Sequence, residues 1–272
     1  MATVTTKLWV GVGVFVLAGS QIDVSSHGAP ELGLNKAWAA SQGGEGGEGG
    51  EGGESGAKKK LNPSGRKVEF LKNLTLVDGH LIAGQELYQA GQIDAAKTHM
   101  KHPRSELYGA LAPGFKEFRT PRFDSSLEKM ANAVQQGQPA ADVAKAHQSV
   151  LTDINKARGE VPASTRERLL AIAQVLRQAS SEFGEGVKDG KLTNAHEYQD
   201  AYGFVKSSMR LLDSIAPRAE AEKDAVEQAR GALRKLSESW PGLSPRDPIN
   251  MTASEIYGTA SLIDLAASSL KS

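Results

Sequence analysis

Cysteine is absent from this chain of 272 residues. Its absence excludes thiolate catalysis, zinc ribbons, iron–sulfur clusters, disulfides, lipidated cysteine and covalent haem attachment through Cys-x-x-Cys-His. Basic and acidic side chains number 32 each, so the formal net charge is zero and no global basic field points to nucleic acid. An exported protein without disulfides has to be held together by core packing alone.

Familiar catalytic signatures are missing as well. The sequence contains no Gly-x-Ser-x-Gly elbow, Walker loop, dinucleotide fingerprint or His-Glu-x-x-His helix. The segment HEYQD, residues 196–200, lacks the second histidine that a zincin needs, and the Gly-x-His-x-x-Glu motif of imelysin-type peptidases is absent. We therefore expect a binding protein rather than an enzyme.

An uncharged apolar run, LWVGVGVFVLAG, occupies residues 8–19 after Lys7. A helix of this length rises about 18 Å, which is short of the roughly 30 Å hydrocarbon core of a bilayer. The run is therefore typical of a secretory signal peptide, with small-x-small cleavage sites at 18–20 and 37–39. We predict a signal peptide over residues 1–39, no permanent membrane span, and a periplasmic or secreted protein. The alternative is an N-terminal anchor that stays uncleaved.

A low-complexity segment follows, in which GGEGGEGGEGGE fills residues 43–54. It has no apolar side chains to bury, its glutamates repel one another, and glycine loses the most entropy on ordering. We predict a disordered linker over residues 40–61 that acts as a flexible spacer.

From Arg66 onward, apolar residues recur every three or four positions rather than every second one. The first such stripe consists of Phe70, Leu74, Val77, Leu81 and Tyr88. The sequence contains no sustained run of alternating apolar and polar residues bounded by turns, so we predict no sheet. The pattern predicts an all-α fold, a helical bundle of about seven to nine helices, forming a single domain over residues 62–272.

Several residues mark expected helix ends. Pro103 cannot donate to the helical hydrogen-bond ladder, so we expect it to follow a helix over 93–102 and to begin the next helix. Ser or Thr followed three residues later by Glu has the spacing of a capping box. This spacing occurs at Ser125–Glu128, Ser164–Glu167 and Thr252–Glu255.

The segment THMKHPRSELY, residues 98–108, contains potential metal ligands. His99 and His102 lie within one turn at the end of the expected second helix, and Glu106 falls in the first turn of the next. Neutral imidazole and carboxylate are ligands for iron, copper and zinc. A short turn around Gly91 folds the second helix back along the first, so His80 is the expected fourth ligand. We predict a site for a divalent transition metal (Fe, Cu or Zn) at His80, His99, His102 and Glu106.

A structural explanation of the same residues competes with the metal site. Imidazolium is stabilised at a helix C-terminus and glutamate in a first helical turn. A lone histidine such as His80 on a partly apolar helix face is also more often a hydrogen-bonded core residue than a ligand.

A second, weaker candidate site consists of His196, Glu197 and Asp200. The two carboxylates are three residues apart, so they share one face of a helix and could hold a cation. The alternative is local, because Asn194 as N-cap with Glu197 three residues later would form a capping box.

A longer pattern follows the turn around Gly190. After six residues come Glu197 and Tyr198, then Asp200 and Phe204. This spacing resembles the periplasmic helical region of bacterial high-affinity iron permeases of the oxidase-coupled type. The resemblance implies a helical fold and a role near metal transport. The membrane helices of those permeases, with their Arg-Glu-Gly-Leu-Glu signature, are missing from the sequence, so transport itself is not implied.

The segments GHLIAGQELYQAG (79–91) and HMKHPRSELY (99–108) resemble a group of exported bacterial helical proteins with Gly-Gly-Glu leaders. That resemblance implies export and a helical fold. We expect a periplasmic protein that binds a transition metal in support of iron or copper handling, with an envelope or metal-transport protein as partner. The rival is a non-catalytic interaction or structural module of the cell envelope that binds no metal.

Overall fold

The computed structural model describes residues 61–271. The predicted signal peptide and all but the last residue of the predicted linker lie outside this range. None of the helices within it combines the length and the apolar character that crossing a bilayer requires.

The predicted all-α fold is confirmed for residues 61–271, which contain nine α-helices. These are α1 (Pro63–Gln89), α2 (Ile93–His102), α3 (Tyr108–Phe118), α4 (Asp124–Gln135), α5 (Ala140–Glu160), α6 (Thr165–Gly186), α7 (Ala195–Asp213), α8 (Glu220–Glu238) and α9 (Ala253–Ser268). A π-helical turn, η1 (Pro103–Leu107), joins α2 to α3. A hairpin of two-residue strands, β1 (Val187–Lys188) and β2 (Lys191–Leu192), pairs antiparallel in the turn around Gly190.

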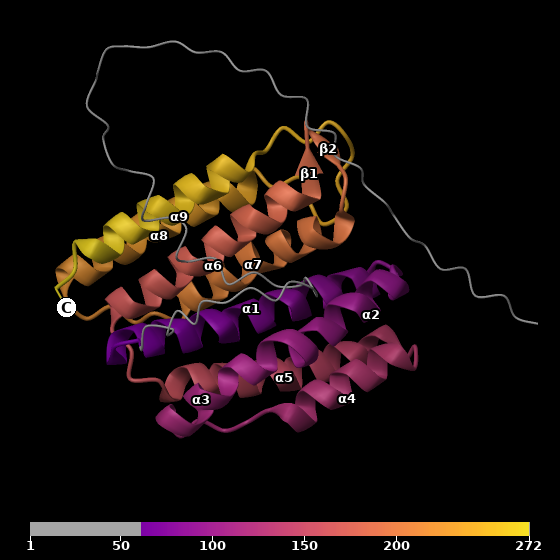
Figure 1. Cartoon of the computed structure of the whole chain (residues 1–272), viewed down its shortest axis with the longest axis horizontal. Helices are drawn as coiled ribbons and strands as arrows, with labels where there is room; N and C mark the ends of the chain where they lie inside the picture. The colour runs from indigo at the N-terminus through magenta and orange to yellow at the C-terminus, as the bar shows by residue number, and fades with distance from the viewer. Residues whose placement is uncertain (1–60, 272) are drawn as a thin grey trace, which may run out of the picture. The chain divides into compact units, whose positions relative to one another are not determined.

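Helix α1 lies between two groups of helices (Figure 1). Helices α6, α7, α8 and α9 form a four-helix group on one side of it, and α2, α3, α4 and α5 lie on the other. Accordingly α1 is buried on nearly all sides, with Leu71, Leu74, Val77 and Leu87 fully inaccessible. A helix covered on both sides in this way lies in the interior of the protein, and its polar residues there, such as Asp78 and His80, contact side chains of other helices.

Close approach of α1 and α7 depends on two glycines. A Cβ atom at Gly203 would overlap the carbonyl oxygen of Gly79, and one at Gly79 would overlap the ring of Phe204. The two backbones therefore touch where neither residue has a side chain. This contact places the residues beside it, His80 on α1 and Asp200 on α7, next to each other.

The turn between α1 and α2 also needs a glycine. Gly91 has a φ of 76°, a conformation that other residues adopt with strain, and its N–H donates to the carbonyl of Tyr88. As predicted, α2 then runs back beside α1.

Two of the three predicted capping boxes are confirmed, at Ser164–Glu167 and Thr252–Glu255. The third, at Ser125–Glu128, is wrong, because α4 begins at Asp124 without a side-chain cap. Tertiary contacts fix this helix start instead. The Tyr108 hydroxyl donates to Asp124 at 2.8 Å and accepts from the N–H of Phe123 at 3.0 Å.

Candidate metal centre

Three histidines from three helices surround the carboxylate of Asp200. His80 comes from α1, His99 from α2, and His196 lies one helical turn before Asp200 on α7. Nδ1 of His80 lies 2.5 Å and Nδ1 of His99 lies 2.9 Å from Oδ1 of Asp200. Nδ1 of His196 lies 3.5 Å from Oδ2. One carboxylate thus faces three imidazole nitrogens.

We call His80, His99 and Asp200 the inner cluster. Their exposed fractions are 6%, 0% and 3%, so water has almost no access to them. Each offers one ligand atom, and these three atoms lie within 4.8 Å of one another. Atoms bound to one ion at about 2.1 Å lie about 3.0–3.4 Å apart, and the three atoms of the inner cluster are separated by no more than 4.8 Å.

The orientation of His99 matches that of a metal ligand. Its Nδ1 faces Asp200, and its Nε2 lies 3.0 Å from Oε1 of Gln199. A ligating histidine commonly donates its second N–H to a carbonyl or carboxylate oxygen, which fixes the tautomer and the ring orientation. Gln199 supplies such an oxygen, so an ion bound at Nδ1 would replace the contact of that nitrogen with Asp200.

Burial alone would raise the pKa of Asp200, because a charged carboxylate loses its hydration. The imidazoles of His80 and His99 outweigh that effect and hold the pKa of Asp200 well below its usual range. The carboxylate is therefore ionised at neutral pH, as a metal ligand has to be.

His196 and Glu197 continue the site outward. The His196 ring stacks on that of His99 with centroids 4.4 Å apart and an interplanar angle of 16°. His196, Glu197 and Asp200 form a second group whose ligand atoms lie within 4.8 Å of one another, and the first two are partly exposed.

The capping-box explanation of Glu197 does not hold. Asn194 is the N-cap of α7, but its side chain accepts from the N–H of His196. The N–H of Asn194 donates to the carbonyl of Gly186, so Glu197 makes no reciprocal bond to it. The Glu197 carboxylate is thereby available to the groups around it.

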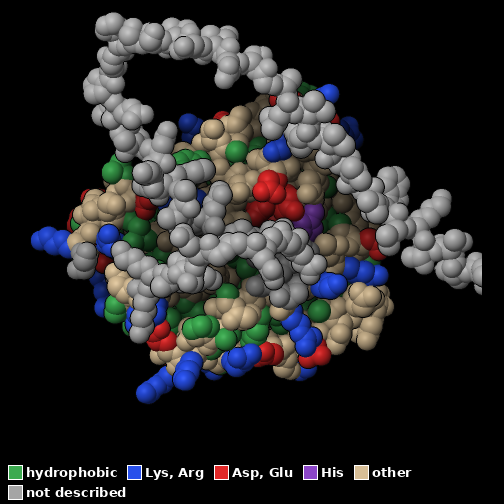
Figure 2. Space-filling model, in the orientation of Figure 1, with side chains coloured by type: hydrophobic (Ala, Val, Ile, Leu, Met, Phe, Trp, Pro, Cys, Tyr) green, Lys and Arg blue, Asp and Glu red, His purple; other side chains and the backbone are tan. Residues whose placement is uncertain are grey.

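A third group, which we call the outer acidic cluster, consists of Glu182, Glu185 and Glu197. Glu185 is exposed and the other two are partly buried. Figure 2 shows acidic side chains gathered beside a histidine near the centre of one face of the molecule. Burial and the neighbouring carboxylate of Glu197 raise the pKa of Glu182 to about 8. Because Glu197 and Asp200 each belong to two groups, potential ligands run without a break from the surface to the inner cluster.

The structure joins parts of the two sites that the sequence predicts separately. His80 and His99 come from the first, and His196, Glu197 and Asp200 come from the second. The side chains of His102 and Glu106 lie outside the described residues, although their backbones end α2 and form part of η1.

Sequence reasoning missed Gln199, Glu182 and Glu185. A signal was present for the two glutamates, which lie three residues apart near the end of α6 and so share a helix face. No comparable pattern marks Gln199.

Residues 159–270 match the family model of the iron permease-associated 4-helix bundle domain. The match spans less than half of the chain and contains α6 to α9, so it supports the resemblance to iron permeases in the segment around Gly190. His80 and His99 lie outside it. No curated protein matches the chain, and no solved structure does so either.

Proposed function

We propose that this protein binds a divalent transition metal at the inner cluster of His80, His99 and Asp200. The observation that carries the proposal is one ionised, buried carboxylate in contact with imidazoles from two other helices. A single carboxylate with two or three imidazoles is a ligand set that iron, zinc and copper accept.

The partly exposed groups give the buried site a route of entry, which a metal site requires. A cation would first meet the outer acidic cluster, then His196 and Glu197, and then the inner cluster. Oxygen ligands outside and nitrogen ligands inside favour a transition metal over calcium at the inner position, because calcium prefers an all-oxygen shell.

The match to the iron permease-associated domain supports iron as the physiological cargo and an envelope or metal-transport protein as partner. We further propose that the protein is periplasmic and non-catalytic, so that it holds or delivers the ion. Support for export comes from the apolar run at 8–19, and support for a binding role comes from the absence of any catalytic motif.

Calorimetric titration of the metal-free, full-length protein with Fe²⁺ under anaerobic conditions, Zn²⁺ and Cu²⁺ tests the proposal. We expect saturation with a defined stoichiometry, and a rise in melting temperature when metal is added. Asp200→Asn keeps the shape of the side chain but should weaken binding by at least about tenfold, because it removes the charged ligand. Asp224→Asn, at an exposed position of α8, is the matched control and should bind like the wild type.

The rival function is a structural one, in which the same residues form a buried ionic network in an interaction module. The contacts of His99 to both Asp200 and Gln199 favour it, since they satisfy both ring nitrogens without a cation. His99→Ala separates the two. Metal binding predicts a loss of melting temperature that is larger with metal present, whereas an equal loss with and without metal, and no saturable titration, would establish the structural role.

A further inference from the structure

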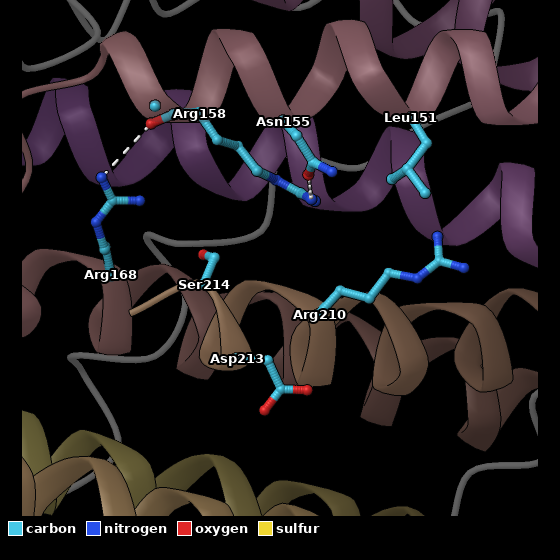
Figure 3. Close-up of a pocket in the computed structure, with 8 residues that line it drawn as sticks. Leu151, Asn155, Arg158, Arg168, Arg210, Asp213 and Ser214 are labelled. Atoms are coloured by element: carbon cyan, nitrogen blue, oxygen red, sulfur yellow. Dashed lines mark hydrogen bonds between the residues drawn. The ribbon is translucent and has the colours of Figure 1, made fainter. Parts of the chain in front are cut away.

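A second site of different chemistry lies between α5, α6 and α7. Its pocket of about 430 Å³ is lined by Leu151, Asn155, Arg158, Gly159, Arg168, Arg210, Asp213 and Ser214. Three guanidinium groups line the pocket (Figure 3). We call it the arginine pocket, and its lining shares no residue with the metal centre.

Arginine charge in this pocket exceeds the acidic charge available to it. The two oxygens of Asp78 are divided between Arg158, at 3.0 Å, and Arg210, at 2.9 Å. Asp213, the one acidic residue in the lining, is paired with Arg230 of α8. Figure 3 shows its carboxylate directed away from the three arginines.

Arg168 has no carboxylate partner within residues 61–271. Its Nη2 makes only long contacts to backbone carbonyls, 3.5 Å to Arg158 and 3.4 Å to Val161. Asp78 is the one carboxylate paired with these arginines among the described side chains, and Glu167 acts on Arg168 only through its charge. A guanidinium stays charged at any physiological pH, so cationic charge remains in surplus.

Arg158 provides an unfilled hydrogen-bond donor. Only 3% of this residue is exposed, and its Nε–H has no partner among the described residues. A buried donor without an acceptor is costly, and a charged one more so, so a side-chain movement that brings this N–H to an acceptor in the pocket would gain free energy.

We propose that the arginine pocket binds a small oxyanion with two or more negative charges, such as phosphate or a polycarboxylate. The paired N–H donors of a guanidinium can each bind one of two oxygens of a carboxylate or a phosphate, and the multiple charges of such an anion offset the surplus of cationic side chains. Asn155 adds a side-chain amide whose NH2 group can donate to oxygen, since its Oδ1 accepts from Arg158. The pocket volume is sufficient for either kind of anion.

Calorimetric titration of the full-length, metal-free protein with inorganic phosphate and, separately, citrate tests this proposal at constant ionic strength. We expect saturable binding of at least one probe at one site per chain. Arg168→Gln should weaken it by about tenfold or more, because a charged hydrogen bond is lost. Arg234→Gln removes the same charge from the exposed surface of α8 and should leave binding unchanged.

The choice of Arg168 limits the effect on folding, since Asp78 keeps both of its partners in the variant. An unchanged melting temperature shows that Arg168→Gln folds, and Arg168→Lys should recover part of the affinity. Phosphate binding alone identifies a tetrahedral anion and citrate binding alone a polycarboxylate. Absence of saturable heat with both probes would overturn the proposal, as would equal affinities for Arg168→Gln and Arg234→Gln. Either of these negative results would leave the proposal of metal binding at the inner cluster unchanged, because the two sites share no residue.

Discussion

His147 shows what the burial of one titratable residue costs. It lies on α5 and is 9% exposed, and its Nε2 has no hydrogen-bond partner among the described residues. Burial, together with the charge of Arg210, lowers the pKa of His147 from 6.5 to about 4, against weaker opposing effects of Asp78 and Glu86. The folded protein therefore holds this imidazole neutral over a pH range in which the unfolded chain protonates it.

The consequence is a loss of stability in acid. Because the pKa is lower in the folded state, the contribution of His147 is present above pH 6.5 and is lost as the pH falls towards 4. The shift corresponds to about 3 kcal/mol. We expect the melting temperature of His147→Leu to fall less than that of the wild type when the pH is lowered from 7 to 4. Parallel melting-temperature profiles for the two proteins would contradict this expectation.

Glu182 should act in the opposite sense. Its pKa rises from 4.5 to about 8, so the folded state keeps a proton that the unfolded chain releases over this range. Its contribution to stability is therefore present at low pH and declines as the pH rises towards 8. Glu182→Gln should flatten the decline in melting temperature between pH 5 and pH 8. Glu227→Gln, at an exposed position of α8, is the control and should keep the wild-type slope.

At the residue scale, the sequence identifies which side chains can bind a metal but not how they combine. Histidines and acids are visible by type, and their spacing within one helix indicates which of them share a face. His99 and Asp200 are 101 residues apart, and no pattern in the sequence around either residue predicts their contact. The sequence therefore predicts two sites, whereas the structure brings members of both onto one carboxylate.

Among the elements, the contact between α1 and α7 is the most sensitive to a small change. Gly203→Ala would drive a methyl group into the backbone of α1, and overpacking of this kind costs about 1–3 kcal/mol or more. The helices have to separate, so His80 moves away from Asp200. We expect a lower melting temperature and weaker metal binding, measured by calorimetry.

Gly231 of α8 is the matched control for that substitution. It lies within a helix, and a Cβ atom at this position would meet no atom within 4 Å. Gly231→Ala should therefore stabilise the protein by about 0.5–1 kcal/mol, because alanine is the better helix former. A similar loss of stability in both variants would show that the contact between α1 and α7 is not the cause.

Element boundaries were predictable where the determining interaction is local. The helix over 93–102 and the capping boxes at Ser164 and Thr252 depend on residues within one turn, and the structure has them as predicted. The box at Ser125 failed because contacts to Tyr108, from another helix, fix the start of α4. Periodicity predicts about seven to nine helices, but their arrangement around α1 depends on contacts between residues distant in sequence.

For the whole molecule, the proposed metal centre takes its residues from both sides of the bundle. The family match covers α6 to α9, whereas His80 and His99 come from α1 and α2. We expect a fragment of residues 58–272, the compact unit that contains every described helix, to keep the melting temperature and the metal affinity of the full chain. A fragment of residues 159–272 should lose metal binding, since Asp200 alone of the inner cluster remains. Full metal affinity in the shorter fragment would show that His80 and His99 are not ligands.

The burial of the inner cluster has a consequence for the rate at which a bound ion leaves. A chelator cannot reach ligands that are 0–6% exposed, so a bound ion has to move outward past His196 and Glu197 before it is captured. Release should therefore be limited by this movement within the protein, and its rate should stop rising with chelator concentration once the chelator captures every ion that escapes. Stopped-flow measurements would detect this plateau. If the inner cluster binds an ion as we propose, we expect the protein to retain that ion for long periods when alone, and we expect fast transfer to require a partner that moves α1 or α2.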